Sequence, residues 1–470
     1  MIKKIFCILL YLIFVIPTVS AKIDVVYPTS KEITVNSDCM FFVGNTDKGA
    51  YFTVNSKPVK LWEDNFFVHV APLEYGRNEI KFRSEINGVV DETVYVVKRN
   101  KVNLSYTGSA NSSYEKINTD GYMYTKTIND NSTVREKPSS SANRLVELQK
   151  GIPLYLEGKK GDYYKIAYTG DTQFWIHKSN VQTPVKIIEK QQPMLRAQRY
   201  YSNEMYDFAT FHLTEPVMYT LTHQNNTIEL TLYGINSQDE NGNITPNYKY
   251  KFTRNKNFLG YDCSYQDNDL TCRLAKLPEN NTSNPLNGLT IFIDAGHGGN
   301  EKGSVGPTRV YEKDINLSIS KYLTEELKNS GVNVITSRTD DTQVKLYDRV
   351  DIAKKNNALI SLSIHANALP NGKNPYLLHG TEVHYYNENA KALAEIIKNN
   401  LSHDLNLRDN GIHRSSFALD RATNPVSVLV EVAYMIHPEE YILLKNPEFQ
   451  RNVAKSIRKS IEQYIGMLKN

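Results

Sequence analysis

The stretch that decides the fold is Leu289-Thr290-Ile291-Phe292-Ile293-Asp294-Ala295-Gly296-His297-Gly298-Gly299. Its first five residues are mostly apolar, as in a strand that is buried on both faces of a sheet. The glycines that follow leave room for the backbone to approach a ligand closely. Downstream, helix-spaced and strand-like segments alternate. We therefore expect helices over 315–327, 346–357, 390–401 and 449–468, and strands over 332–335, 359–364, 382–386 and 426–432. This alternation predicts an α/β domain at 287–470, with a mostly parallel sheet covered on both faces.

The preceding residues have a different composition. Residues 22–286 hold 21 of the 31 tyrosines, a residue type that favours strands. Short alternating runs, separated by turn signals such as Asn55-Ser56-Lys57-Pro58 and Gly76-Arg77-Asn78, predict a small β-sandwich at 22–100 that resembles bacterial immunoglobulin-like modules. Residues 101–120 are rich in Ser, Asn and Gly and indicate a linker. The protein is thus expected to be multidomain, with N-terminal all-β modules.

Two further β modules are expected. The pattern Val134-Arg135, Gly161-Asp162-Tyr163-Tyr164 and Trp175-Ile176-His177 within residues 121–183 resembles a bacterial Src-homology-3-like (SH3-like) barrel. That resemblance implies a module that binds peptidoglycan in many wall enzymes. Residues 190–286 alternate in the same way and predict a β-rich domain directly before the α/β domain.

The N-terminus has the features of a secretory signal. Lys3 and Lys4 precede an apolar run from Ile5 to Val15, and small residues lead to a predicted cleavage site after Ala21. This run is well short of the roughly 20 residues that a membrane-spanning helix needs. We expect residues 1–21 to be removed, the mature protein to carry no transmembrane segment, and the protein to be exported to the periplasm or secreted.

Export makes disulfides possible. Cys263 and Cys272 flank a candidate two-residue turn at Asp267-Asn268, which would place the two cysteines opposite each other in a hairpin. We predict a Cys263–Cys272 disulfide, whereas Cys39 is expected to behave as a buried small hydrophobic residue.

Charge and composition exclude several classes of protein. The chain has 470 residues, 40% hydrophobic and 23% charged, with a formal net charge of +4. Such values are ordinary for globular domains and argue against a disordered or fibrous chain. A charge this small, without a Lys/Arg block, does not indicate a nucleic-acid partner.

Three residues stand where chemistry is expected in an α/β sheet, near the carboxyl ends of strands, and a fourth lies just before a helix. His297 follows the first strand, His365 ends the strand at 359–364, and Glu431 lies near the end of the strand at 426–432. Glu312 precedes a helix that is expected to begin near Asp314. Two imidazoles, one carboxylate and an open position form a common catalytic zinc set.

Motifs across residues 288–468 resemble the zinc-dependent N-acetylmuramoyl-L-alanine amidases of the amidase type 3 family. The matching stretches are Ile293-Asp294-Ala295-Gly296-His297-Gly298-Gly299, Glu312-Lys313-Asp314-Ile315-Asn316-Leu317, Ser337-Arg338-Thr339-Asp340, Leu346-Tyr347-Asp348-Arg349, Ser361-Leu362-Ser363-Ile364-His365-Ala366-Asn367 and Pro425-Val426-Ser427-Val428-Leu429-Val430-Glu431. The resemblance implies that His297, Glu312 and His365 bind Zn²⁺ and that Glu431 is the catalytic acid/base. It also implies that peptidoglycan is the substrate, cut between N-acetylmuramic acid and L-alanine.

The remaining expectations concern neighbouring residues and alternatives. Asp294 is a candidate acceptor behind a metal ligand. His413 is the best candidate among the other histidines for touching substrate, although the sequence assigns no substrate-binding residue. Division-type members of the family carry an inhibitory helix before the last strand, whereas residues 387–424 have room for only one helix and a loop, which predicts constitutive activity once zinc is bound. The protein is also expected to be a monomer associated with the cell wall. The alternatives are a zinc peptidase acting on the stem peptide and an inactive peptidoglycan-binding protein.

Overall fold

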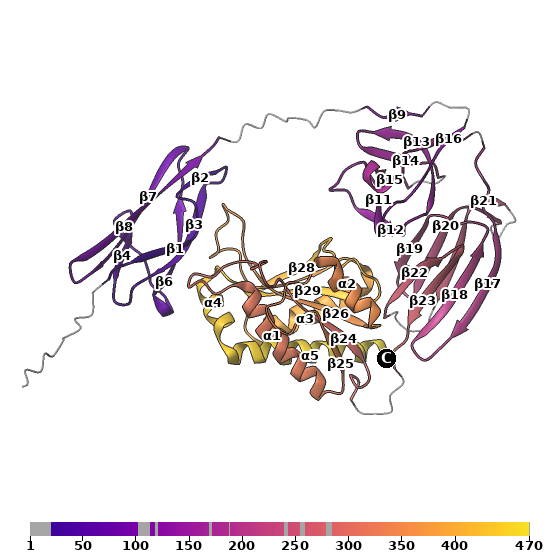
Figure 1. The fold of residues 1–470 in the computed structure, drawn as a ribbon. Coiled ribbons are helices and arrows are strands. Elements are labelled where there is room, and N and C mark those ends of the chain that lie inside the picture. The colour runs from indigo at the N-terminus through magenta and orange to yellow at the C-terminus, as the bar shows by residue number, and fades with distance from the viewer. Residues whose placement is uncertain are drawn as a thin grey trace, which may run out of the picture.

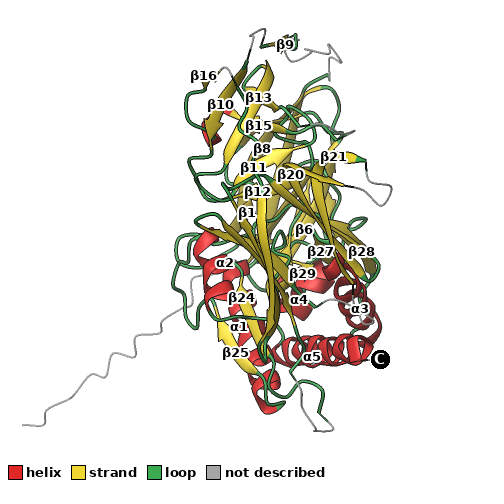
Figure 2. Ribbon diagram, turned by 90° about the vertical axis from the view of Figure 1, so that its right-hand side faces the viewer, coloured by secondary structure: helices red, strands yellow, loops and turns green. Residues whose placement is uncertain are grey.

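The computed structural model describes residues 20–101, 113–117, 121–168, 172–187, 189–238, 243–253, 259–278 and 284–469 (Figure 1). The predicted signal peptide, apart from its last two residues, and most of the predicted linker at 101–120 lie outside the described residues. Among the helices that are described, none is long and apolar enough to cross a membrane. The chain is multidomain and mostly β, with a C-terminal α/β region, as the sequence predicted (Figure 2).

The N-terminal module consists of two sheets. One has the strand order β1-β3-β6 and the other the order β2-β8-β7-β4-β5. The strands are β1 (Ile23–Tyr27), β2 (Glu32–Val35), β3 (Cys39–Thr46), β4 (Tyr51–Val54), β5 (Lys57–Pro58), β6 (Phe66–Pro72), β7 (Gly76–Ile86) and β8 (Val89–Arg99). Alternate residues point inward, and Phe42, Phe67 and Phe82 fill the core between the sheets. Cys39 is only half-buried, so the expectation that it is buried was only partly right.

The second module is a single sheet. Its order is β12-β11-β15-β14-β13-β10-β16, and β9 pairs with β13. The strands are β9 (Glu115–Lys116), β10 (Tyr122–Lys126), β11 (Ser132–Arg135), β12 (Arg144–Leu148), β13 (Pro153–Lys160), β14 (Tyr163–Ile166), β15 (Trp175–His177) and β16 (Val185–Ile187). Trp175 is buried, whereas Tyr163 and Tyr164 are half-buried.

The third module pairs a sheet of order β17-β18-β23-β22 with one of order β19-β20-β21. The strands are β17 (Leu195–Ser202), β18 (Tyr206–Leu213), β19 (Tyr219–Gln224), β20 (Thr227–Gln238), β21 (Ile244–Thr253), β22 (Tyr261–Gln266) and β23 (Asp269–Ala275). Cys263 and Cys272 are directly opposite in the β22–β23 hairpin and form the predicted disulfide, with Cα atoms 3.9 Å apart.

The C-terminal region is an α/β sheet of order β25-β24-β26-β29-β27-β28. The strands are β24 (Thr290–Ala295), β25 (Asn333–Thr336), β26 (Ile360–Asn367), β27 (Thr381–Tyr385), β28 (Asp409–Arg414) and β29 (Val426–Tyr434). All neighbouring pairs are parallel except β27 with β29, so the sheet is mostly parallel, as predicted. The sequence missed β28 and the one antiparallel pair.

Helices cover both faces of this sheet, as expected. They are α1 (Glu312–Asn329), α2 (Leu346–Lys355), α3 (Glu388–Asp404), α4 (Pro438–Lys445) and α5 (Pro447–Lys469). Ile319, Ile397 and Ile457 bring α1, α3 and α5 into one core, while Ala353 of α2 packs with Phe292 on the other face. The short helix α4 was not predicted.

Contacts tie the β modules to the α/β region. The side chain of Asp24 in β1 forms an ion pair of 2.6 Å with Arg309, and Phe66 packs edge-on against Tyr441 of α4. The first module therefore rests beside α4 (Figure 1). On the other side, Glu147 of β12 pairs with the guanidinium of Arg421 at 2.8 Å.

Candidate metal centre and active site

Three of the predicted site residues converge at the carboxyl edge of the sheet. His297 comes from the loop after β24, His365 from the end of β26, and Glu312 is the first residue of α1. The His297 Nε2 atom lies 3.1 Å, and the His365 Nδ1 atom 2.9 Å, from the same Glu312 oxygen, Oε1. These donor atoms all lie within 4.8 Å of one another.

The local sequence leaves space for this convergence. His297 adopts a φ of 62°, in the left-handed region, which turns the chain sharply after the strand. A Cβ atom on Gly296 would lie 2.3 Å from the His365 ring nitrogen Nε2. A Cβ on Gly303, whose φ is 67°, would lie 2.5 Å from Glu312 Oε2. Any side chain at either glycine would collide with the three residues.

The carboxylate of Glu312 is held in its charged form. Burial raises its pKa, but the hydrogen bonds and charges of His297 and His365 outweigh that effect and bring the pKa far below its usual range. The backbone N–H of Ser304 donates to Glu312 Oε2 at 2.8 Å, and the Asn316 amide donates to Oε1 at 3.3 Å. An anionic carboxylate facing two imidazoles is a suitable donor set for a divalent cation.

The donor set fits zinc. Zinc in catalytic sites takes three protein ligands from imidazole and carboxylate groups and keeps one position open. The rings of His297 and His365 are nearly perpendicular, at 78°, with centroids 4.9 Å apart. Both rings thus aim a nitrogen at one point beside Glu312 without blocking each other.

Glu431 of β29 lines the same cavity, which has a volume of about 440 Å³. Its Oε2 atom is buried and has no hydrogen-bond partner among the described residues. Burial raises the pKa of Glu431 well above its usual value, and the charges of Glu312, Glu382 and Asp420 raise it further. The side chain thus lies beside the three donors in an environment that favours its protonated form. Neither Arg414 nor Arg421 pairs with it, because they contact Tyr386 and Glu147 instead.

A comparison with known protein families matches the part of the chain that contains these site residues. A family model described as Amidase_3, N-acetylmuramoyl-L-alanine amidase, matches residues 291–463. The uncharacterized protein YqiI of Bacillus subtilis is 36% identical over 183 residues, which are 38% of this chain and 86% of YqiI. The chain belongs to the Amidase_3 family of N-acetylmuramoyl-L-alanine amidases. The predicted family and enzyme class are thereby confirmed.

Two further amidases are similar to part of this chain. The N-acetylmuramoyl-L-alanine amidase LytC of Bacillus subtilis is 35% identical over 189 residues, 39% of this chain but only 37% of LytC. The crystal structure of an N-acetylmuramoyl-L-alanine amidase from Clostridium difficile 630 is 34% identical and covers 38% of this chain and 98% of that one, with a TM-score of 0.37. The residues matched by the family model lie in the C-terminal α/β domain, called the amidase domain below.

Two arginines of the amidase domain support the donor loop, and the sequence analysis gave neither a role. Arg349 of α2 donates from Nη2 to the carbonyl of His297 at 2.8 Å and pairs through Nη1 with Asp294 at 2.5 Å. Arg338 donates to the carbonyls of Ala295 and Gly296 at 2.9 and 3.0 Å. Both lie within the motifs quoted above, which was the available signal.

The expectation for Asp294 was wrong. Its carboxylate does not accept from a candidate ligand. Oδ1 pairs with Arg349, and Oδ2 accepts from the Ser363 hydroxyl at 2.7 Å. The reason is the geometry of β24, which turns this side chain toward α2 and β26 rather than toward the histidines. Asp294 therefore acts on the His297 loop only through Arg349.

A second group of metal-type donors lies in the amidase domain, made of His379, His437 and Glu440. Here the rings of the two histidines are stacked, 8° from parallel with centroids 3.9 Å apart. His379 Nδ1 is 2.6 Å from Glu440 Oε1, and the Tyr434 N–H donates to Glu440 Oε2 at 2.8 Å. His437 Nδ1 accepts from the Glu440 N–H and caps α4. Hydrogen bonds therefore already engage this group.

His413 lies apart from the candidate centre. Its Nε2 atom contacts the Asn410 carbonyl at 2.9 Å and lies 3.7 Å from the Glu382 carboxylate. Glu382 also accepts from the Asn367 amide at 2.6 Å. The ring is 46% exposed and does not line the cavity around Glu431. Substrate contact by His413 stays a prediction.

Proposed function

We propose that this amidase hydrolyses the amide bond between N-acetylmuramic acid and L-alanine of peptidoglycan, with Zn²⁺ bound by His297, Glu312 and His365. The observation that carries the proposal is the approach of two imidazole nitrogens to one oxygen of Glu312, in a cavity that also holds Glu431. When bound, zinc would polarise the amide carbonyl and lower the pKa of a bound water to about 7.

The protein's own groups would perform the proton transfers. Glu431 takes the proton of the attacking water and passes it to the leaving amine, as general base and then general acid. Its burial and its unpartnered Oε2 favour such a role, because no hydrogen bond competes for the proton. Arg349 and Arg338 would keep the His297 loop in place while charge develops on the substrate.

We further propose the domain organisation 22–100, 121–183, 190–286 and 287–470, following a signal peptide at 1–21. In this proposal the first module is an immunoglobulin-like sandwich, the second an SH3-like barrel and the third a β-rich domain that precedes the amidase domain. Their expected role is to hold an exported monomer, periplasmic or secreted, at the cell wall. Two sheets around one aromatic core support the first assignment.

Digestion of purified peptidoglycan tests the proposal. The wild type, with about one zinc per chain, is expected to release peptides that begin with L-alanine. Glu431→Gln removes the proton carrier without changing the size of the side chain, and should lower kcat by about 10²–10⁴-fold while zinc is retained. Glu301→Gln is the matched control, since Glu301 lines the same cavity.

The products distinguish the alternatives. Cleavage within the stem peptide would indicate a zinc peptidase, and binding to the wall without any release would indicate an inactive binding protein. Equal activity of the wild type and Glu431→Gln would refute the proposed mechanism.

A further inference from the structure

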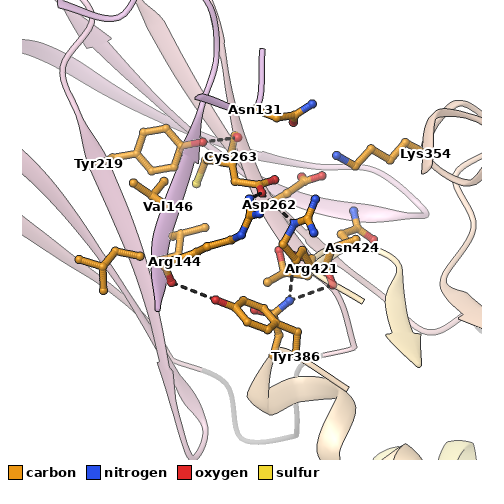
Figure 3. Close-up of a pocket in the computed structure, with 16 residues that line it drawn as sticks. Asn131, Arg144, Val146, Tyr219, Asp262, Cys263, Lys354, Tyr386, Arg421 and Asn424 are labelled. Carbon is orange, nitrogen blue, oxygen red and sulfur yellow. Dashed lines mark hydrogen bonds and ion pairs between the residues drawn. The ribbon is translucent and has the colours of Figure 1, made fainter. Parts of the chain in front are cut away.

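A cavity of about 200 Å³ lies where the second module, the third module and the amidase domain meet. Figure 3 shows Arg144, Asp262 and Arg421 around its centre, with Lys354 reaching in from the amidase side. Arg144 belongs to β12, Asp262 to β22 and Lys354 to α2. Residues of three modules thus line this cavity. Its volume is below the usual range for a drug-sized ligand and suits a small terminal group.

The lining carries more positive than negative charge. Its two carboxylates are already neutralised within the protein. Glu147 contacts Arg144 at 2.9 Å and Arg421 at 2.8 Å. Asp262 forms a two-pronged pair with Arg273, at 2.6 and 2.8 Å. No lining carboxylate is therefore left to attract a cation.

Two cationic side chains of the lining, by contrast, keep N–H donors that no described residue engages. Lys354 has no hydrogen bond or ion pair within the part of the chain that the structure describes, and its side chain is exposed at the cavity rim. The side-chain hydrogen bonds of Arg144 to described residues both start from Nη1. An arginine carries five N–H donors in a planar fork, so Arg144 still presents donors on its other nitrogens.

The pKa of a neighbouring guanidinium shows the same excess of positive charge. Burial lowers the pKa of Arg135, and the charges of Arg144 and Arg421 lower it further. Like charges that face one another at a domain boundary are unfavourable unless an anion joins them. Glu147 already joins Arg144 and Arg421. Lys354, unpaired among the described residues, and the remaining N–H donors of Arg144 are therefore the groups that favour an anionic ligand.

The same two elements line this cavity and the cavity around Glu431. Helix α2 contributes Leu346 and Arg349 to the cavity around Glu431 and Lys354 to the cavity between the modules. The segment after β28 does the same, because Phe417 and Leu419 line the first cavity whereas Arg421 and Asn424 line the second. The two cavities therefore lie on the same two elements, helix α2 and the segment after β28.

We propose that the cavity between the modules binds the free C-terminal carboxylate of the peptide stem whose first amide is cut at the candidate zinc centre. This assignment rests on the proposed function. Leu346 and Lys354 are eight residues apart, which is about 12 Å along a helix. An extended peptide covers about 3.3–3.6 Å per residue, so a stem of four residues spans about 13–14 Å. Stems with a free end would be preferred over stems whose last carboxyl group is blocked.

The test compares two substrates, N-acetylmuramoyl tetrapeptides that end in a carboxylate or in a carboxamide. The wild type should cleave the acid with about fivefold higher kcat/KM, as one charge-assisted contact allows. Lys354→Gln should remove most of this preference and Lys354→Arg should keep it. Lys355→Gln is the matched control, since it makes the same change of charge on the next residue of α2, outside the lining.

Ionic strength gives a second test of the preference for the acid over the amide. The preference of the wild type should shrink as ionic strength rises, because the Debye length falls from about 10 Å at 0.1 M to about 3 Å at 1 M. Equal cleavage of acid and amide by the wild type would overturn the carboxylate site while leaving the amidase function intact. A preference unchanged in Lys354→Gln would also overturn it. Failure to cut either substrate at the alanine amide would instead refute the proposed function, and the site with it.

Discussion

Among the described residues of the amidase domain, two groups of two histidines and one glutamate have all their donor atoms within 4.8 Å of one another, and they differ in geometry. In the first, His297 and His365 stand at 78° to each other and each points a nitrogen at Glu312 Oε1. In the second, His379 and His437 are stacked at 8°, and only His379 points at the Glu440 carboxylate. The residue types are the same, so only the arrangement can separate their functions.

The difference teaches what a metal centre requires beyond suitable donors. An imidazole lone pair lies in the plane of its ring, so two stacked parallel rings direct their lone pairs along separate parallel planes. Perpendicular rings can meet at one point, about 2.0–2.1 Å from each nitrogen when zinc is bound. In the second group, the Glu440 N–H also occupies Nδ1 of His437. We therefore infer a metal centre in the first group and a structural role in the second.

The largest expected effect is on metal content. His297→Ala should reduce bound zinc from about one per chain to near zero and abolish amidase activity, because two protein ligands do not hold the metal. His379→Ala, the same change in the second group, should leave zinc content and activity near wild type. Elemental analysis of the purified proteins, together with peptidoglycan digestion, measures both. Two zinc ions per wild-type chain, reduced to one by His379→Ala, would show that the second group also binds a metal.

A second expected effect separates the supports of the two groups. Arg349→Lys should lower zinc affinity or kcat/KM by about 10–100-fold, since a lysine cannot hold Asp294 and the His297 carbonyl together. Arg408 provides the matched control beside the second group, where its guanidinium donates to the carbonyl of Leu377. Arg408→Lys should change neither quantity. Competition with a metal chelator gives the affinity. Equal behaviour of the two variants would show that the His297 loop needs no support.

The sequence predicted the first group because its members lie in local motifs. His297 and His365 follow apolar strand runs, and such runs of a parallel sheet end at the same edge. The contribution of Arg349 depends on a contact across 55 residues with Asp294, which no local pattern encodes. The predicted role of Asp294 failed for the same reason, because its partner could not be identified from strand periodicity.

The fold shows the same limit. Strands with continuous apolar cores, such as β24 and β29, were predicted within a few residues. Strand β28, at Asp409–Arg414, was missed because it is a mostly polar edge strand without an apolar run. Helix α4 has eight residues and begins at Pro438, so it offers too few turns for a helical period. Both missed elements lie near the second group, whose hydrogen bonds depend on α4.

A third expected effect concerns stability rather than activity. Glu440→Gln should lower the free energy of unfolding by about 1–3 kcal/mol, because it removes the charge that faces His379 and weakens the acceptor for the Tyr434 N–H. Glu439→Gln, one residue earlier and exposed, is the control. Chemical denaturation measures the difference. Zinc content should be unaffected, and loss of zinc in Glu440→Gln would assign the second group to a metal.

The smallest expected effect is a dependence of stability on pH that arises in the second group. Burial lowers the pKa of His437, and the neighbouring His379 lowers it further, although Glu440 opposes this. In the unfolded chain the pKa of a histidine is about 6.5, so the unfolded state binds a proton first as the pH falls. Stability is therefore complete above about pH 6.5, is lost below it, and levels off once the folded-state pKa is passed. The loss has an upper limit of about 1.4 kcal/mol per pH unit.

His437→Asn should flatten this slope, since asparagine can cap α4 without titrating in this range. His403→Asn, at a ring that is 88% exposed, should retain it. Denaturation at pH 7.5 and at about pH 5.5 gives the slopes, and equal slopes for His437→Asn and the wild type would show that His437 is not the titrating group.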